Sequence, residues 1–88
     1  MLDELLILKK IKEGDIKAFE ELFRRYYFPL CCNAAGITGQ MAVAEEIVEE
    51  LFYVLWKERE RLQIFQSVKS YLYRATRNQS LQYCEHEE

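Results

Sequence analysis

The chain has 88 residues, of which 50% are hydrophobic and 31% are charged, with 3 glycines and 1 proline. A chain of this length forms one domain, and its hydrophobic content is too high for an intrinsically disordered protein. So few glycines and prolines argue against an all-β sandwich, whose many turns require them. The net charge of −3 means that any nucleic-acid contact must come from a local basic patch.

The cysteines, Cys31, Cys32 and Cys84, do not resemble a disulfide framework or a zinc motif. Their number is odd, no C-x-x-C is present, and the only histidine is His86 near the end of the chain. We therefore expect reduced thiols that fill helix faces, and no metal or cofactor. The acidic N-terminus is unlike a signal peptide and no apolar run approaches the length of a membrane span, which predicts a soluble cytoplasmic protein.

Apolar residues recur at spacings of three and four in every long segment, which predicts an all-α fold, a compact bundle of about four helices. The first helix is expected over residues 2–12, capped by Asp3 at its start and ended by Gly14 in a left-handed conformation. Asp15 begins the second helix. Its apolar face is formed by Ala18, Phe19, Leu22, Phe23, Tyr26 and Leu30. Pro29 lies within this face, and the apolar residues after it favour a kink over a stop.

Residues 35–39 contain two glycines and are the clearest predicted break in the chain. A third helix is expected from about Met41 to Arg61. Its predicted apolar face consists of Val43, Ile47, Leu51, Val54 and Leu55, and its opposite face is acidic, with Glu45, Glu46, Glu49 and Glu50.

Residues 62–66 lack a strong helical pattern and are expected to form a connecting loop. Ser67 is the predicted cap of a last helix that runs to about Tyr83. One face of this helix is expected to consist of Val68, Leu72, Ala75, Gln79 and Gln82. Residues 85–88 are predicted to be a frayed tail.

Charge is distributed unevenly along the chain. Residues 1–40 carry six acidic and six basic side chains, residues 45–60 carry a net charge of −4, and the last four residues carry −3. Residues 61–84 have no acidic side chain and four basic ones, Arg61, Lys69, Arg74 and Arg77. An acidic helix beside a basic one predicts two surfaces with two different partners.

Tyrosines interleave with the basic residues of the last helix. Basic side chains supply phosphate contacts, and rings such as those of Tyr71 and Tyr73 can stack on unpaired bases for roughly 1–3 kcal/mol each. The alternative is that both tyrosines are half-buried core residues and that the arginines and glutamates belong to ordinary solvated faces. Neither patch decides the function by itself.

Three segments of the chain carry a further pattern. They are Gly14-Asp-Ile-Lys-Ala-Phe-Glu-Glu-Leu-Phe-Arg-Arg-Tyr-Tyr-Phe-Pro-Leu30, Ala44-Glu-Glu-Ile-Val-Glu-Glu-Leu-Phe52 with Leu55-Trp56, and Ser70-Tyr-Leu-Tyr-Arg-Ala-Thr-Arg-Asn78. In this order and spacing they resemble region 2 of bacterial RNA polymerase sigma factors of the sigma-70 family, most closely the extracytoplasmic-function (ECF) group. The second segment is similar to that group's A-E-D-I-V-Q-E-x-F…L-W pattern, and the third to its x-W-L-x-R-I-A-R-N pattern. The resemblance covers about residues 14–83.

This resemblance implies a transcription initiation factor module that binds core RNA polymerase and helps to recognise and melt the promoter −10 element. In the family, the helix with the acidic pattern docks on the clamp helices of the polymerase β′ subunit, which are basic at this contact. By position, the resemblance assigns polymerase binding to Glu46, Glu49, Glu50, Tyr53 and Trp56.

The resemblance also implies that the last helix and the loop before it hold the non-template strand of the −10 element as single-stranded DNA. In ECF members this loop, here residues 62–66, takes up a base flipped out of the stack. The DNA-binding residues that the resemblance implies are Arg61, Lys69, Ser70, Tyr71, Arg74, Arg77 and Asn78. An anti-sigma factor is a further implied partner, and a membrane is not.

The chain departs from the family pattern at several places. Glu49 stands where glutamine is usual, and Tyr71 stands where many members have tryptophan. The last helix ends in Tyr83-Cys-Glu-His-Glu-Glu88 where members commonly have Lys or Arg, and these acids would repel phosphate. We expect residues 1–88 to form a single region 2-like domain without the C-terminal helix-turn-helix domain of ECF factors, either as an excised domain or as a shortened relative.

A second interpretation is a helical protein-interaction module that docks through its acidic helix without binding DNA. The acidic tail and the expected absence of a second domain favour it. An enzyme is not expected, because the sequence has no acid–base constellation, no glycine-rich phosphate loop and no metal-ligand spacing.

Overall fold

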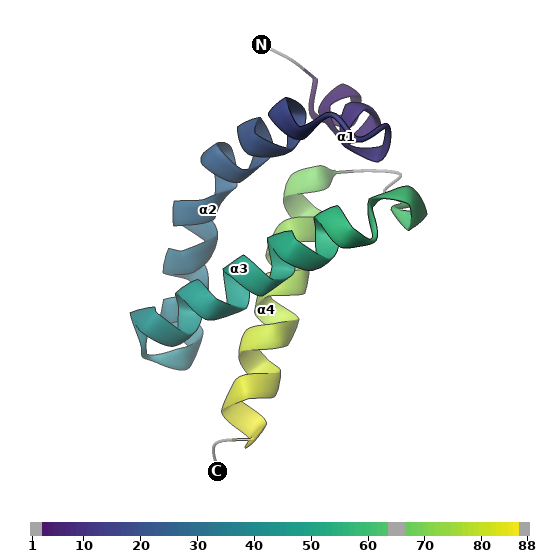
Figure 1. Cartoon of the computed structure of the whole chain (residues 1–88). Coiled ribbons are helices and arrows are strands. Elements are labelled where there is room, and N and C mark those ends of the chain that lie inside the picture. Colours follow the sequence, from purple (N-terminus) through teal and green to yellow (C-terminus); the bar gives the residue numbers. More distant parts are fainter. Residues whose placement is uncertain (1–2, 64–66, 87–88) are drawn as a thin grey trace.

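The computed structural model describes residues 3–63 and 67–86, and all regular structure in these ranges is helical. The helices are α1 (Glu4–Lys12), α2 (Ile16–Thr38), α3 (Met41–Lys57), the short 3-10 helix η1 (Arg59–Arg61) and α4 (Val68–His86) (Figure 1). The prediction of an all-α bundle of about four helices is confirmed. None of the described helices combines the length and the apolar character that a membrane crossing needs.

The predicted N-caps are present at three helices. The Asp3 carboxylate accepts the Leu5 N–H at 3.3 Å, and the Asp15 carboxylate accepts the backbone N–H groups of residues 17 and 18 at 3.0 and 3.2 Å. The Ser67 hydroxyl accepts the N–H of residue 70 at 3.1 Å. Gly14, with φ of 90°, turns the chain between α1 and α2, as expected. Local sequence therefore determines where these helices begin.

Helix α2 is longer than the sequence indicated. As expected, the helix continues past Pro29. Its axis bends between its two ends (Figure 1). The predicted break at residues 35–39 is wrong for most of its length, because the helix continues through Gly36 to Thr38. Only Gly39 leaves the helix, with φ of 77°, and its N–H donates to the Ala35 carbonyl at 2.8 Å. A single glycine inside a helix costs about 1 kcal/mol, which is too little to end α2 at Gly36.

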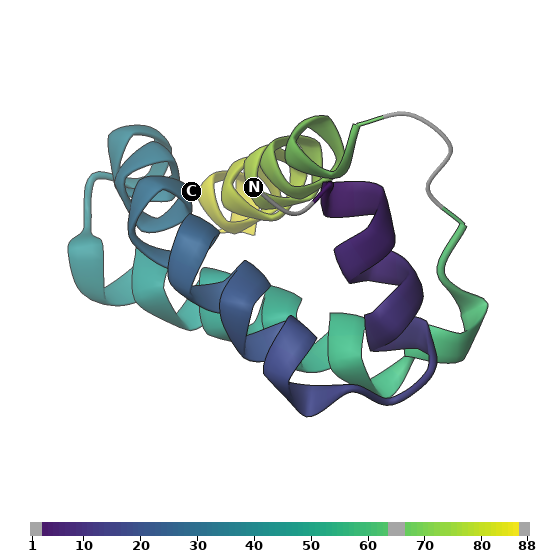
Figure 2. The ribbon, with the colours of Figure 1, turned by 90° about the horizontal axis from the view of Figure 1, so that it is seen from above.

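Helix α2 is the central support of the fold. It packs against both α3 and α4, and each of these contacts is more extensive than the contact between α3 and α4. Helix α1 lies across one end of this arrangement and touches α2, η1 and α4 (Figure 2). The core residues of the first two helices are Ile7, Leu8, Ile11, Ala18, Leu22, Tyr26, Leu30, Cys31 and Ala34.

The predicted apolar face of the third helix is displaced by about one residue. The buried residues of α3 are Ala44, Val48, Phe52 and Leu55, of which only the last was predicted. The expected residues Val43, Ile47 and Leu51 are only partly buried, and Val54 is 43% exposed. The predicted end at Arg61 is also wrong, because α3 ends at Lys57 and residues 59–61 form η1.

The face predicted for the last helix coincides with its buried face only in the first half. Val68 and Leu72 are buried, but the next buried positions are Thr76 and Ser80. Helix α2 packs against α4, and near the end of α4 the Cys84 thiol donates to the Ile37 carbonyl oxygen at 3.4 Å. The predicted positions Gln79 and Gln82 are exposed, and Ala75 is partly buried.

The last helix continues past its predicted end at Tyr83 to His86. Glu85, expected in the frayed tail, is therefore helical, and residues 87–88 lie outside the described residues. All three cysteines are free, as expected of reduced thiols. Cys31 lies in the core, where burial raises the pKa of its thiol.

Candidate functional site

The outer face of α3 carries four of the five residues predicted to bind the polymerase. Glu46, Glu49, Glu50 and Tyr53 are all exposed, and Tyr53 is 60% exposed. At 100° per residue they fall within an arc of about 100° on one side of the helix. The structure therefore brings these four side chains together on a single acidic surface.

Glu49 lies at the edge of this surface that faces α2. Its carboxylate accepts a hydrogen bond from the Tyr27 hydroxyl at 3.0 Å. Burial, and after it this bond to a carboxylate, raises the pKa of Tyr27. Glu49 is thus tied to α2 by this hydrogen bond.

Trp56 differs from the other predicted polymerase contacts because it is enclosed by the protein's own side chains. One neighbour is Phe19 of α2, whose ring centroid lies 5.0 Å away. Another is the guanidinium of Arg59, 4.3 Å from the indole centroid. Trp56 is consequently only partly exposed and belongs to the aromatic cluster between α2 and α3.

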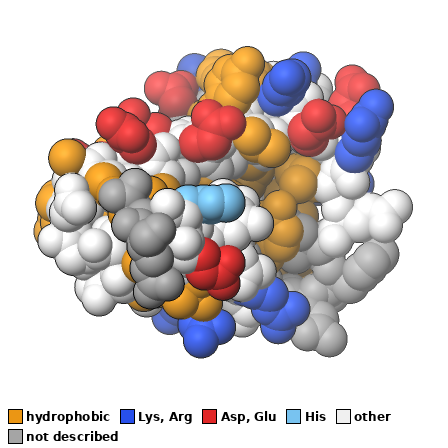
Figure 3. Space-filling view, turned by 90° about the horizontal axis from the view of Figure 1, so that it is seen from below, with side chains coloured by type: hydrophobic (Ala, Val, Ile, Leu, Met, Phe, Trp, Pro, Cys, Tyr) orange, Lys and Arg blue, Asp and Glu red, His pale blue; other side chains and the backbone are white. Residues whose placement is uncertain are grey.

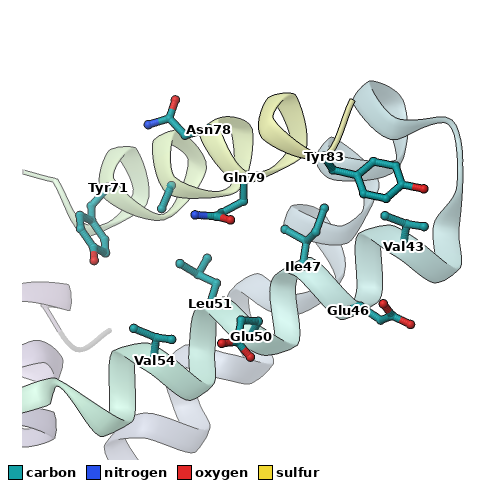
Figure 4. Close-up of a pocket in the computed structure, with 11 residues that line it drawn as sticks. Val43, Glu46, Ile47, Glu50, Leu51, Val54, Tyr71, Asn78, Gln79 and Tyr83 are labelled. Atoms are coloured by element: carbon teal, nitrogen blue, oxygen red, sulfur yellow. The ribbon is translucent and has the colours of Figure 1, made fainter. Parts of the chain in front are cut away.

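A groove runs between α3 and α4 with a volume of about 610 Å³. Hydrophobic side chains line a hollow on this side of the molecule, with acidic side chains above it (Figure 3). The groove contains most of the apolar face predicted for the third helix, and in the close-up Leu51 faces Gln79 across it (Figure 4). Both charged side chains in its lining, Glu46 and Glu50, are acidic. This electrostatic character disfavours phosphate within the groove.

The predicted DNA-binding residues of α4 fall on two sides of the helix. Ser70, Arg74 and Arg77 lie within an arc of about 60° on its solvent face, and all three are exposed. Tyr71 and Asn78 are rotated toward α3 and line the groove, although the Asn78 amide is turned away from α3 (Figure 4). The structure thus groups the two arginines with the serine but separates them from the tyrosine.

Lys69 and Arg61 lie at the beginning of α4 and in η1, on different sides of α1 (Figure 2). Both are exposed, and the Arg61 side chain, 85% exposed, pairs with Glu58 at 3.5 Å. The predicted connecting loop is described only at its first two residues, Leu62 and Gln63. Its residues 64–66, which belong to the loop expected to accept a flipped base, lie outside the described residues.

Two features of this region were not predicted from the sequence. The first is Arg59, which stacks on Trp56 and donates from Nη1 to the Trp56 carbonyl at 3.0 Å. The three-residue spacing after the only tryptophan is a signal that could have indicated it. The second is the groove itself, which could not be predicted because its lining depends on how α3 and α4 are rotated relative to each other. The residues within 3–63 and 67–86 contain no group of His, Cys, Asp or Glu side chains suited to a metal ion.

A comparison with protein families places the chain among known domains. The model of sigma-70 region 2 matches residues 22–88, which include α3, η1, α4 and most of α2. The expected resemblance began at residue 14, so its first eight residues lie outside this match. Comparisons with curated proteins and with solved structures gave no significant match. The chain therefore belongs to the sigma-70 region 2 family, a transcription-factor domain with a general role in RNA polymerase binding and promoter melting, and not an enzyme family.

Proposed function

We propose that this domain is an ECF-type promoter-recognition module that binds the β′ clamp helices of core RNA polymerase through α3 and single-stranded −10 DNA through α4. One observation carries the proposal: α3 and α4 present outer faces of opposite charge while resting on the same helix, α2. The ECF assignment is supported by the Ala44–Phe52 pattern and by the Ser70–Asn78 pattern.

The polymerase half of the proposal rests on the acidic surface of α3. Glu46, Glu49 and Glu50 supply negative charge to a basic partner, and Tyr53 supplies an exposed ring among them. Opposite charges on two partners steer their encounter and fix their orientation. Trp56 contributes at the margin of this surface, through the part of its indole that Phe19 and Arg59 leave uncovered.

The DNA half of the proposal rests on the outer face of α4. Arg74 and Arg77 follow the backbone of the displaced strand, with Ser70 beside them and Lys69 at the start of the helix. Tyr71, 38% exposed, and Asn78 meet bases at the rim of the groove. Arg61 approaches the same strand from η1. No acidic residue occurs between residues 61 and 84, so nothing in this segment opposes phosphate.

A binding assay with core RNA polymerase tests the first half. Glu46→Arg and Glu50→Arg are expected to weaken binding by about tenfold or more each, because like charges then face the basic partner. Glu20→Arg is the matched control, since Glu20 is an exposed glutamate on α2. Equal binding by all three variants would remove the assignment of this surface.

Fluorescence anisotropy of a labelled single-stranded −10 oligonucleotide, with core polymerase present, tests the second half. The Arg74→Ala, Arg77→Ala double variant should bind several-fold more weakly and with less dependence on salt. A Lys9→Ala, Lys17→Ala double variant removes the same charge from exposed positions of α1 and α2. Polymerase binding without salt-sensitive DNA binding would instead support the protein-interaction module.

A further inference from the structure

The end of α3 is held by one side chain that folds back onto it. The guanidinium of Arg59 lies 4.3 Å from the Trp56 ring centroid, and its Nη1 donates to the Trp56 carbonyl oxygen at 3.0 Å. Carbonyls in the last turn of an α-helix have no partner within the helix. Arg59 therefore satisfies one of these carbonyls and covers the indole with the same planar group.

This contact leaves Arg59 with a donor that has no partner in the described residues. Its Nε is buried and makes no hydrogen bond. An unpaired buried donor costs about 1–3 kcal/mol. The stack on the indole and the hydrogen bond to the Trp56 carbonyl are thus the contacts that hold the guanidinium in this place.

The position of Arg59 determines the direction of the chain beyond α3. Residues 59–61 form η1, and the next residue, Leu62, is buried in the hydrophobic core. Arg61 lies between these two anchored positions, and its side chain, 85% exposed, pairs with Glu58 at 3.5 Å. With Arg59 bound to α3 and Leu62 bound in the core, the backbone at Arg61 has little freedom to turn.

We propose that Arg59 is a positioning residue that fixes η1 on the end of α3 and thereby aims Arg61 at the DNA strand. The inference rests on the proposed function, in which Arg61 contacts the strand. Lysine cannot replace Arg59, because an ammonium group has neither the planar face for the indole nor the fixed fork of donors. The requirement is thus for the shape of the side chain and not for its charge.

The test compares Arg59→Lys, Arg61→Ala and the double variant in the oligonucleotide assay with core polymerase. Arg59→Lys keeps the charge and is expected to weaken DNA binding by about fivefold, since the lost contacts are weak ones. Arg61→Ala should weaken DNA binding by a similar factor. Because Arg59 acts through Arg61, the double variant should bind no more weakly than Arg61→Ala alone.

A second measurement reports the stack itself. Trp56 is the only tryptophan of the chain, so its fluorescence reports this site alone. Arg59→Lys should make the indole more accessible to acrylamide quenching, whereas Lys57→Ala, which removes a neighbouring cation that lies over Tyr53, should not. Unchanged circular dichroism will show that each variant remains folded.

The possible outcomes separate the inference from the function on which it rests. If the wild-type protein does not bind the oligonucleotide, or if Arg61→Ala binds it as tightly as the wild type, the proposed DNA contact of Arg61 fails. If Arg61→Ala weakens DNA binding but Arg59→Lys does not, or if the two effects multiply in the double variant, the positioning role of Arg59 is overturned.

Discussion

At the scale of single residues, the polar groups between α1, α2 and α4 determine how stability responds to mutation and pH. Glu4 accepts hydrogen bonds from Arg25 at 3.1 Å and from the Tyr26 hydroxyl at 2.5 Å, which ties α1 to α2. Burial, and after it the bond to Glu4, raises the pKa of Tyr26 to about 12. By contrast, the Thr76 hydroxyl is buried in α4 and has no hydrogen-bond partner in the described residues.

Tyr26 makes stability depend on alkaline pH. Its folded pKa of about 12 exceeds the ordinary value of 10.0, so the neutral form is favoured in the folded state. The stability that Tyr26 contributes is fully present below pH 10. It is lost as the pH rises from 10 to 12, because Tyr26 then ionises in the unfolded chain before it does so in the folded protein. The free energy of unfolding should fall by roughly 1 kcal/mol by pH 11. Urea unfolding followed by circular dichroism at pH 8–11 should show this decrease, and Tyr26→Phe should show a smaller one.

Replacing Thr76 by an apolar residue of the same shape should stabilise the protein. Thr76→Val removes the unpartnered hydroxyl and keeps the volume, so the free energy of unfolding should increase by about 1 kcal/mol. Ser80→Ala is the comparison, because the Ser80 hydroxyl donates to the Thr76 carbonyl at 2.8 Å. We expect Ser80→Ala to give no such gain in urea unfolding. A loss of stability in Thr76→Val would mean that its hydroxyl has a partner in solution.

At the scale of helices, the sequence predicted which segments are helical better than it predicted which face of each is buried. Helix α3 carries two adjacent apolar stripes. Periodicity alone does not reveal that the stripe containing Val48 is buried in the core while the stripe containing Ile47 lines the groove. In α4 the buried positions Thr76 and Ser80 are polar, so an apolar pattern could not reveal them. The acidic surface of α3 was predictable, because charged residues identify the solvent face directly.

The two glycines at the end of α2 should respond to alanine in opposite ways. Gly36 is helical, and an added Cβ would meet nothing within 4 Å, so Gly36→Ala should stabilise the protein by about 0.5–1 kcal/mol. Gly39 has φ of 77°, so Gly39→Ala should destabilise it by about 1–2 kcal/mol. Thermal unfolding of both variants measures the contrast. Equal effects of the same sign would contradict the left-handed conformation at Gly39.

At the scale of the whole molecule, the net charge of −3 conceals two charged surfaces on separate helices. The acidic surface of α3 and the basic face of α4 are separated by the groove, whose charged lining residues are both acidic. Glu49, Tyr53, Arg74 and Arg77 do not line the groove, so the two proposed binding activities should change independently under substitutions at these positions.

Salt dependence should reveal this separation. In the presence of polymerase, the Arg74→Ala, Arg77→Ala variant should lower the slope of log K against log salt by roughly 1.4, since each phosphate contact with a single strand contributes about 0.7. Glu49→Arg, at a position on the side of the acidic surface that faces α2 and does not line the groove, should leave this slope for the bound complex unchanged. A variant of α4 that alters polymerase affinity as much as DNA affinity would show that the surfaces are coupled.

The central position of α2 has a genetic consequence. Random mutations that abolish transcription should fall into classes with different binding defects, because substitutions on the outer faces of α3 or α4 impair one proposed activity each. Substitutions at buried positions of α2 such as Leu22 and Leu30 should form a third class that loses both. Their second-site suppressors should map to the interiors of α3 and α4, where the packing against α2 can be restored, and not to either binding face.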